Sequence, residues 1–192
     1  HVLKPGDARA LVMGEESGCC QSVDNAASEC AEAAYAGENS SIFAIDAEDG
    51  KLISQSFIWL TRDGKHLIVD SIETIHQLTA TSPYTKLIAQ AYLDLAAEMN
   101  KKNIQVVMSA SNYNNAGSRV YDCIKAMFPK ELKANNRNGS YFEEDDNEYV
   151  YSQDFTAKDN FDYSDLSDTV VNLSKLVKAK EKASSSKKTK SE

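Results

Sequence analysis

Cysteine, proline and long apolar runs are scarce in this sequence. Its 192 residues include four Cys and three Pro, and the cysteines show no CxxC spacing. So few cysteines, two of them adjacent, do not build the disulfide framework of a small secreted domain. We therefore predict reduced thiols in a cytoplasmic-type environment. Apolar runs such as HLIV and FIWL are far too short to cross a bilayer, which predicts a soluble chain without membrane contact.

Positive charge is also scarce, except at the end of the chain. The net charge is −8, yet residues 174–192 hold seven Lys and two acidic residues, which leaves −13 on the other 173. Because residues 1–173 are so acidic, they repel phosphate backbones, and we predict no nucleic-acid partner for this part of the chain. Residues 141–168 hold ten Asp and Glu against one Lys. We predict one domain over 1–173, with this acidic part near its end, and a disordered basic low-complexity tail over 174–192.

Turn signals divide the middle of the chain into three β-rich runs. The segments AEDGK and TRDGK each carry Asp-Gly, which is a strong hairpin signal. The sequence therefore predicts an antiparallel three-strand meander over Ser41–Asp46, Leu52–Leu60 and His66–Glu73.

Further elements are predicted on both sides of this meander. A short strand over Ala8–Gly14 and a helix closed by Gly37 precede it. An amphipathic helix follows, with an apolar stripe at Leu87, Ile88, Ala91, Leu95 and Met99. A buried strand over Ile104–Ser111 comes next, and then a second helix that ends at Pro129.

The predicted fold class is α/β (α+β), a mixed and mostly antiparallel sheet flanked by helices. Because a helix joins the strands over 66–73 and 104–111, we expect these two to be parallel neighbours. The element order is β-α-β-β-β-α-β-α. One or two strands from 141–168 and a short helix beginning near Ser164 or Ser167 complete it.

The second helix opens with the motif Asn114-x-x-Gly117-x-x-x-Tyr121. Its first and last residues are about two helical turns apart and share one face. In this motif, and in element order over residues 8–128, the sequence resembles the GCN5-related N-acetyltransferase (GNAT) superfamily. The resemblance implies acetyl-CoA as co-substrate and an amine as acceptor. It also implies that Asn114 and Gly117 contact coenzyme A, and that Tyr121 protonates the leaving thiolate.

The rest of the implied site follows the third strand of the meander. If the strands ending at Glu73 and Ser111 splay, a cleft opens where a helix N-terminus offers N–H groups to a pyrophosphate. The resemblance implies Glu73 or His76 as the general base. It implies coenzyme A contacts from Ser71, Ile72, Gln77, Thr79, Thr81 and Ser82. The loop QLTATSPYT lacks the glycines that the family usually has there, so the chain is a divergent member.

Two other classes of function are compatible with the sequence. A GNAT-like domain without coenzyme A binding would be an interaction module, and its Ser/Lys/Glu tail is similar to translocation signals of some secreted bacterial effectors. Alternatively, Cys19 or Cys20 would be the nucleophile of a Cys-dependent hydrolase, with His66 or His76 as its base. No metal site is predicted. The acceptor is expected to be a small-molecule amine or a basic protein, which an acidic rim would suit.

Overall fold

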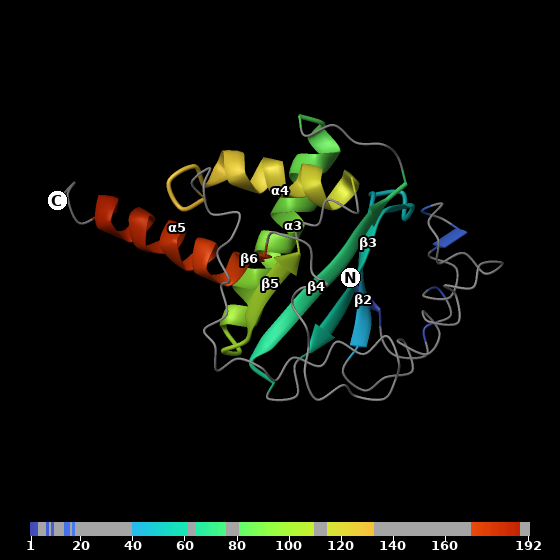
Figure 1. The fold of residues 1–192 in the computed structure, drawn as a ribbon, viewed down its shortest axis with the longest axis horizontal. Helices are drawn as coiled ribbons and strands as arrows, with labels where there is room; N and C mark the ends of the chain where they lie inside the picture. Colours follow the sequence, from blue (N-terminus) through green and yellow to red (C-terminus); the bar gives the residue numbers. More distant parts are fainter. Residues whose placement is uncertain are drawn as a thin grey trace.

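The computed structural model describes residues 1–3, 7, 9, 14–15, 17, 40–60, 64–75, 81–109, 115–132 and 170–188. This part of the chain forms a six-stranded sheet in the order β1-β2-β3-β4-β5-β6, together with three helices (Figure 1). The pair β4–β5 is parallel, and the other four neighbouring pairs are antiparallel. The predicted class, a mixed and mostly antiparallel sheet with helices, is confirmed at this level.

The three-strand meander forms as predicted. Its strands are β2 (Ser40–Asp46), β3 (Leu52–Leu60) and β4 (His66–Thr74), each within one residue of the predicted bounds. Gly50 and Gly64 have φ angles of 80° and 68°, which glycine adopts without a steric penalty. Both glycines belong to the Asp-Gly pairs that carried the prediction.

The start of the sheet differs from the prediction. Its first strand is β1 (Val2–Leu3), which pairs antiparallel with β2. The predicted strand over 8–14 is wrong where the structure describes it, because Arg9 and Gly14 have helical backbone. A short run of apolar and small residues satisfies one helical turn as well as a strand. The predicted helix closed by Gly37 lies outside the described residues.

The crossover from β4 to β5 is confirmed. Helix α3 (Pro83–Asn100) joins β4 to β5 (Gln105–Ser109), and these two strands are parallel. Val106, Val107 and Met108 are all buried, as expected for a strand covered on both faces. Helix α4 (Asn115–Met127) follows and contacts both α3 and β4. It lies beyond the tip of β5, and α3 runs behind β5 (Figure 1).

Most of the predicted stripe of α3 faces the core, since Ile88 and Leu95 are buried and Ala91 and Met99 pack against the core, but the buried face is rotated slightly away from Leu87. Leu87 is 58% exposed, whereas Ile88 and Tyr92 are fully buried. Tyr92 was not part of the predicted stripe, which followed residues four apart. A row of residues four apart drifts around the helix, because four residues exceed one turn. Tyr92, the largest fully buried side chain among the described residues, belongs to the face that α3 turns to the sheet.

Alanine substitutions at the adjacent residues Leu87 and Ile88 test this rotation. We expect Ile88→Ala to lower the free energy of unfolding by about 2–4 kcal/mol, since it empties a packed site. Leu87→Ala should change it by less than about 0.5 kcal/mol. Urea denaturation of the two variants measures the difference, and equal losses would show that the predicted stripe was right.

The end of the described chain is a strand followed directly by a helix. Strand β6 (Val170–Asn172) pairs antiparallel with β5, and helix α5 (Leu173–Lys188) begins at the next residue. The Asn172 Oδ1 accepts the N–H of Lys175 at 3.0 Å, which is an N-cap interaction. Helix α5 therefore begins well after the predicted start near Ser164 or Ser167.

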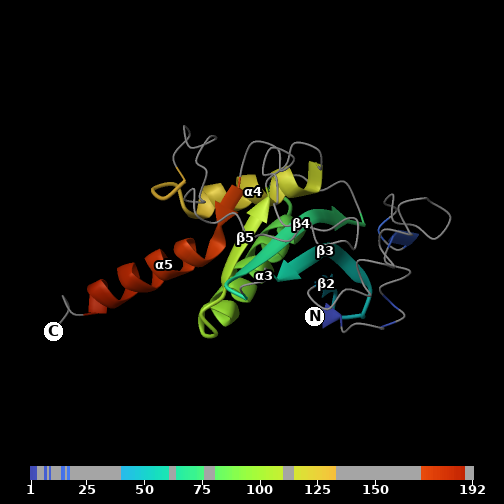
Figure 2. The ribbon, with the colours of Figure 1, turned by 60° about the horizontal axis from the view of Figure 1, so that its bottom comes forward.

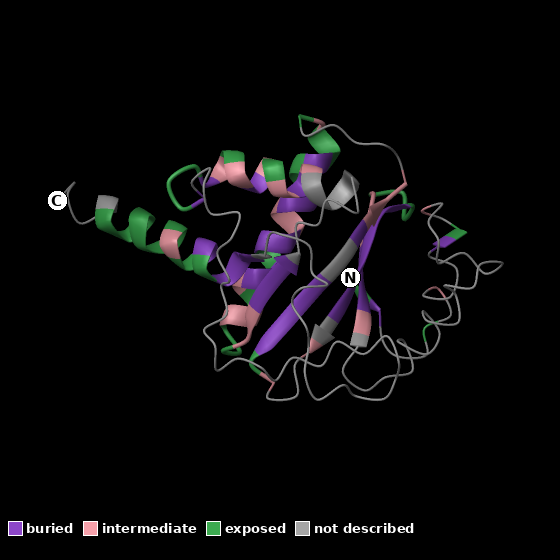
Figure 3. Cartoon of the chain, in the orientation of Figure 1, coloured by how far each residue is buried: buried purple, intermediate pink, exposed green. Residues whose placement is uncertain are grey.

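Helix α5 also replaces most of the tail that was predicted to be disordered. Its first turns bury Leu173, Leu176 and Val177 against the body. The buried Ser174 hydroxyl accepts the N–H of Val106 at 2.8 Å and so joins α5 to β5. The remainder of α5 is largely exposed and extends away from the sheet (Figure 3). The strands predicted within 141–168 lie outside the described residues.

Both faces of the sheet bury apolar side chains. We call the side on which α3 packs the α3 face, and the other side the opposite face. The α3 face carries a core that includes Phe43, Ile58, Val69 and Met108. The register places Ile42, Phe57, Ile68 and Val107 on the opposite face, where they are also buried. Within this apolar sheet, three buried polar residues of β3 stand out, namely Ser54, Gln55 and Ser56.

Candidate active site at the end of strand β4

Strands β4 and β5 are paired over only part of their length. The register between them runs from His66 opposite Gln105 to Val69 opposite Met108. Strand β5 ends one residue later, whereas β4 continues to Thr74. Figure 2 shows the carboxyl ends of these strands pointing in different directions. Within the described residues, the end of β4 therefore lies beyond its pairing with β5.

A β-bulge in this last part of β4 decides which way Glu73 points. Phe57 pairs with Asp70, but Gln55, two residues earlier, pairs with Glu73. Strand β4 thus has one residue more than β3 over this interval, which is a bulge. In an unbulged register Glu73 would lie opposite Ser54, on the α3 face. The bulge instead places Glu73 on the opposite face and allows Ile72 to join the core.

On the opposite face, Glu73 is in one row with residues of β2 and β3. The register aligns Ala44, Gln55 and Glu73 across the three strands. The Gln55 amide donates to the Ser17 hydroxyl at 3.0 Å. A residue of the N-terminal segment therefore contacts this face directly beside Glu73.

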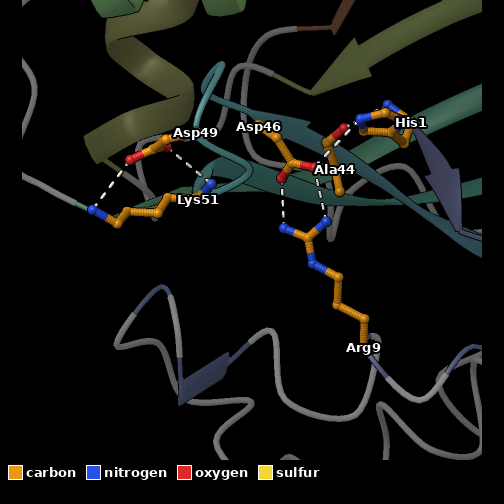
Figure 4. A network of polar contacts seen from close by, with 6 residues as sticks. All are labelled: His1, Arg9, Ala44, Asp46, Asp49 and Lys51. Atoms are coloured by element: carbon orange, nitrogen blue, oxygen red, sulfur yellow. Dashed lines mark hydrogen bonds and ion pairs between the residues drawn. The ribbon is translucent and has the colours of Figure 1, made fainter.

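A second contact of the N-terminal segment is an ion pair at the end of β2. The Arg9 guanidinium makes two hydrogen bonds to the Asp46 carboxylate, at 2.8 and 2.5 Å (Figure 4). Two parallel bonds of this kind fix orientation as well as charge. Asp46 is two residues from Ala44, so this pair lies near the same row of the sheet. Arg9 and Ser17 together show that the N-terminal segment reaches the face that carries Glu73.

Glu73 has the electrostatic character of a candidate base. Its side chain is half-buried, and this burial raises the pKa of the carboxyl group above its ordinary value of 4.5. A carboxylate with a raised pKa accepts a proton more readily near neutral pH. Glu73, predicted as a catalytic residue, is therefore placed and tuned in a way that suits proton transfer.

A buried group of hydroxyls lies behind Glu73, on the α3 face. The Tyr92 hydroxyl donates to Ser56 Oγ at 2.8 Å, and Ser54 Oγ donates to the Glu73 carbonyl at 2.8 Å. Burial raises the pKa of Tyr92 far above its ordinary value, and hydrogen bonds with Ser56 and Ser54 oppose that rise. Tyr92 is thus a protonated donor at neutral pH. This group was not predicted from the sequence, although Ser-x-Ser within an apolar strand was a signal for it.

The N-terminus of α3 has a limited capacity to bind an anion. Ser82 occupies the N-cap position without a side-chain capping bond, and Pro83, which has no N–H, follows it. The Lys86 N–H donates to the Ser82 carbonyl at 3.2 Å. The first turn therefore offers an anion fewer N–H groups than a turn without proline. Thr81 and Lys86 are exposed nearby and can supply a hydroxyl and a positive charge.

Tyr121 and Cys123 lie on α4 and pack against the core. Both are half-buried, and both border the core cluster of the α3 face. Burial raises the pKa of the Cys123 thiol, and the charge of Lys86 opposes this rise. Helix α4 is therefore close to the beginning of α3. Tyr121, predicted as a general acid, packs against the core of the α3 face, whereas Glu73 is on the opposite face of the sheet.

The other predicted site residues are placed less completely. Ile72 is 2% exposed, so its side chain belongs to the core and leaves only its backbone for a ligand. Ser71 and Gly117 are located by backbone alone, in β4 and in α4. Several predicted residues lie outside the described part of the chain: His76, Gln77, Thr79, Asn114, Cys19 and Cys20. His66, the other predicted partner of a cysteine nucleophile, is buried at the start of β4.

The described residues lack the features of two other kinds of site. They contain no group of three or more His, Cys, Asp or Glu side chains that could hold a metal ion. No helix among them is long and apolar enough to span a membrane. Comparisons of the chain with protein-family models, with curated proteins and with solved structures found no match.

Proposed function

We propose that this protein transfers an acyl group from an acyl-coenzyme A to an amine. The observation that carries the proposal is the position of Glu73. It is a half-buried carboxyl group with a raised pKa, located where β4 extends past its last paired position with β5. A perturbed carboxyl group at a strand end is a candidate for proton transfer in catalysis.

The two faces of the sheet suggest how the residues would divide the chemistry. A thioester between the ends of β4 and β5 would have Glu73 on one side and Tyr121 on the other. Glu73 would take a proton from the substrate ammonium, directly or through water, and the free amine would attack the thioester carbonyl. Collapse of the tetrahedral intermediate would break the C–S bond, and Tyr121 would give its proton to the departing thiolate. The nitrogen would release its extra proton as the amide forms, and this proton would restore the Tyr121 hydroxyl through water.

The diphosphate of coenzyme A would bind at the beginning of α3. Thr81 and Ser82 can donate hydroxyl hydrogen bonds there, and Lys86 adds a positive charge. The same region favours the second candidate, an interaction module without coenzyme A binding. Pro83 removes one N–H from the first turn, and the preceding loop has no glycine to let phosphates approach the backbone.

Binding of acetyl-CoA separates these two functions. If it binds, 100-fold saturation should raise the melting temperature by about 5–10 °C, because the ligand stabilises only the folded state. Lys86→Glu should weaken this shift, while Lys102→Glu, an equally exposed lysine just after α3, should leave it unchanged. Differential scanning fluorimetry and calorimetric titration give both results.

No shift with millimolar acetyl-CoA would contradict the acyltransferase proposal and favour the interaction module. Equal effects of the two lysine variants would show that the ligand binds elsewhere.

A further inference from the structure

We infer that Ser54 is a positioning residue for Glu73, because its hydroxyl holds the bulge that presents this carboxylate on the opposite face. The meaning of this position for catalysis rests on the proposed function, whereas the geometry does not. Ser54 is on β3 and belongs to the α3 face, so it acts on Glu73 from behind the sheet.

The contact joins a fully buried donor to the backbone of the bulge. Ser54 is 0% exposed, and its Oγ donates to the Glu73 carbonyl at 2.8 Å. The register also pairs Glu73 with Gln55, so the hydroxyl adds a side-chain contact to the ladder at the place where the bulge ends. This second contact from β3 holds the backbone at Glu73 in position.

Tyr92 connects this contact to the main helix of the domain. Its hydroxyl donates to Ser56 at 2.8 Å and also interacts with Ser54. Tyr92 itself is fully buried, with its ring packed against Phe43 at a centroid distance of 5.2 Å. The three hydroxyls therefore tie α3, β3 and the end of β4 into one group. Networks of this kind hold a particular arrangement when each member has a partner.

The serines at 54 and 56 form a matched pair for a test. Both are buried on the same strand face, and both interact with Tyr92, but of these two hydroxyls only that of Ser54 bonds the Glu73 backbone in the described contacts. Loss of either hydroxyl should lower stability to a similar extent. Only loss of the Ser54 hydroxyl should change the surroundings of the Glu73 carboxylate.

The experiment is an NMR titration of the Glu73 carboxyl in the full chain labelled with ¹³C-glutamate, assigned with Glu73→Gln. In Ser54→Ala the titration midpoint should differ measurably from the wild-type midpoint, because the carboxylate loses the position that the bulge gives it. In Ser56→Ala it should stay at the wild-type midpoint. If Ser54→Ala does not fold, Ser54→Thr and Ser54→Val replace it. Threonine and valine have nearly the same shape, so a difference between the midpoints of these two variants reports the effect of the hydroxyl.

An unchanged midpoint in the variants without the Ser54 hydroxyl would overturn the inference, as would an equal change in Ser56→Ala. The titration needs no ligand, so its result is independent of acetyl-CoA binding. A shifted midpoint in a protein that does not bind acetyl-CoA would support the positioning role of Ser54 and contradict the acyltransferase proposal. If acetyl-CoA binds but the Glu73 midpoint is the same in Ser54→Ala as in the wild type, the result would support the acyltransferase proposal and contradict the positioning role of Ser54.

Discussion

Replacing Tyr92 with alanine should lower the free energy of unfolding by about 3–5 kcal/mol. The side chain is fully buried between α3 and the sheet, where its ring packs on Phe43 and its hydroxyl bonds Ser56. Alanine would leave a cavity and deprive buried serines of a partner. Since domains are stable by only about 5–15 kcal/mol, this loss would leave much of the protein unfolded near 37 °C.

Two further tyrosine variants make this expectation specific. Tyr92→Phe keeps the ring and should lose about 1–2 kcal/mol, the contribution of a buried hydroxyl contact. Tyr84→Ala removes a tyrosine from the same helix, but its side chain is 52% exposed, so the change should be within about 0.5 kcal/mol. Urea and thermal denaturation measure all three. A Tyr92→Ala loss no larger than that of Tyr84→Ala would mean that α3 does not pack through Tyr92.

If Glu73 is the general base of the proposed acyl transfer, Glu73→Gln should reduce that activity by about 10²–10⁴-fold, the range for loss of a general base. Its effect on stability should have the opposite direction. Because burial raises the pKa of Glu73 in the folded protein, the charged carboxylate destabilises the fold above that pKa. The glutamine variant should therefore melt higher at neutral pH. Since the side chain is only half-buried, the gain should be below about 1 kcal/mol, or about 4 °C.

The pH dependence of the melting temperature tests whether the Glu73 carboxylate destabilises the fold. As the pH falls through the raised pKa, wild-type Glu73 becomes neutral, so the two melting temperatures should converge below about pH 4. Glu131→Gln, a change at an exposed glutamate, is the control and should track the wild type. A Glu73→Gln variant that melts lower than wild type at neutral pH would show that the carboxylate is stabilised by a partner.

Local signals in the sequence were sufficient for much of the fold. The Asp-Gly pairs before Lys51 and Lys65 predicted the meander, since a tight turn and its flanking strands are set by neighbouring residues. The continuous apolar run of β5 predicted a strand buried on both faces and, with the preceding helix, its parallel pairing to β4. Glu73 could be singled out because it ends a predicted strand at that junction.

The remaining errors arise where distant residues decide the outcome. The bulge at the end of β4 depends on the register with β3 and on the Ser54 hydroxyl, and neither leaves a pattern within β4 itself. The buried face of α3 depends on the fit of Tyr92 against β3. The lysine-rich composition after 174 predicted disorder, but three apolar residues at the start of α5 are enough to dock its first turns.

The bulge also has a consequence for which sequence changes the protein can tolerate. Adjacent residues at the end of β4 have opposite requirements, because Ile72 must be apolar and enclosed while Glu73 must reach solvent. An insertion or deletion between Asp70 and Glu73 would shift the register by one residue, so that Ile72 and Glu73 exchange faces although the identity of neither residue changes. Chain length in this interval is therefore under stricter constraint than residue identity. Among related sequences, we expect gaps to be excluded there even where substitutions are frequent.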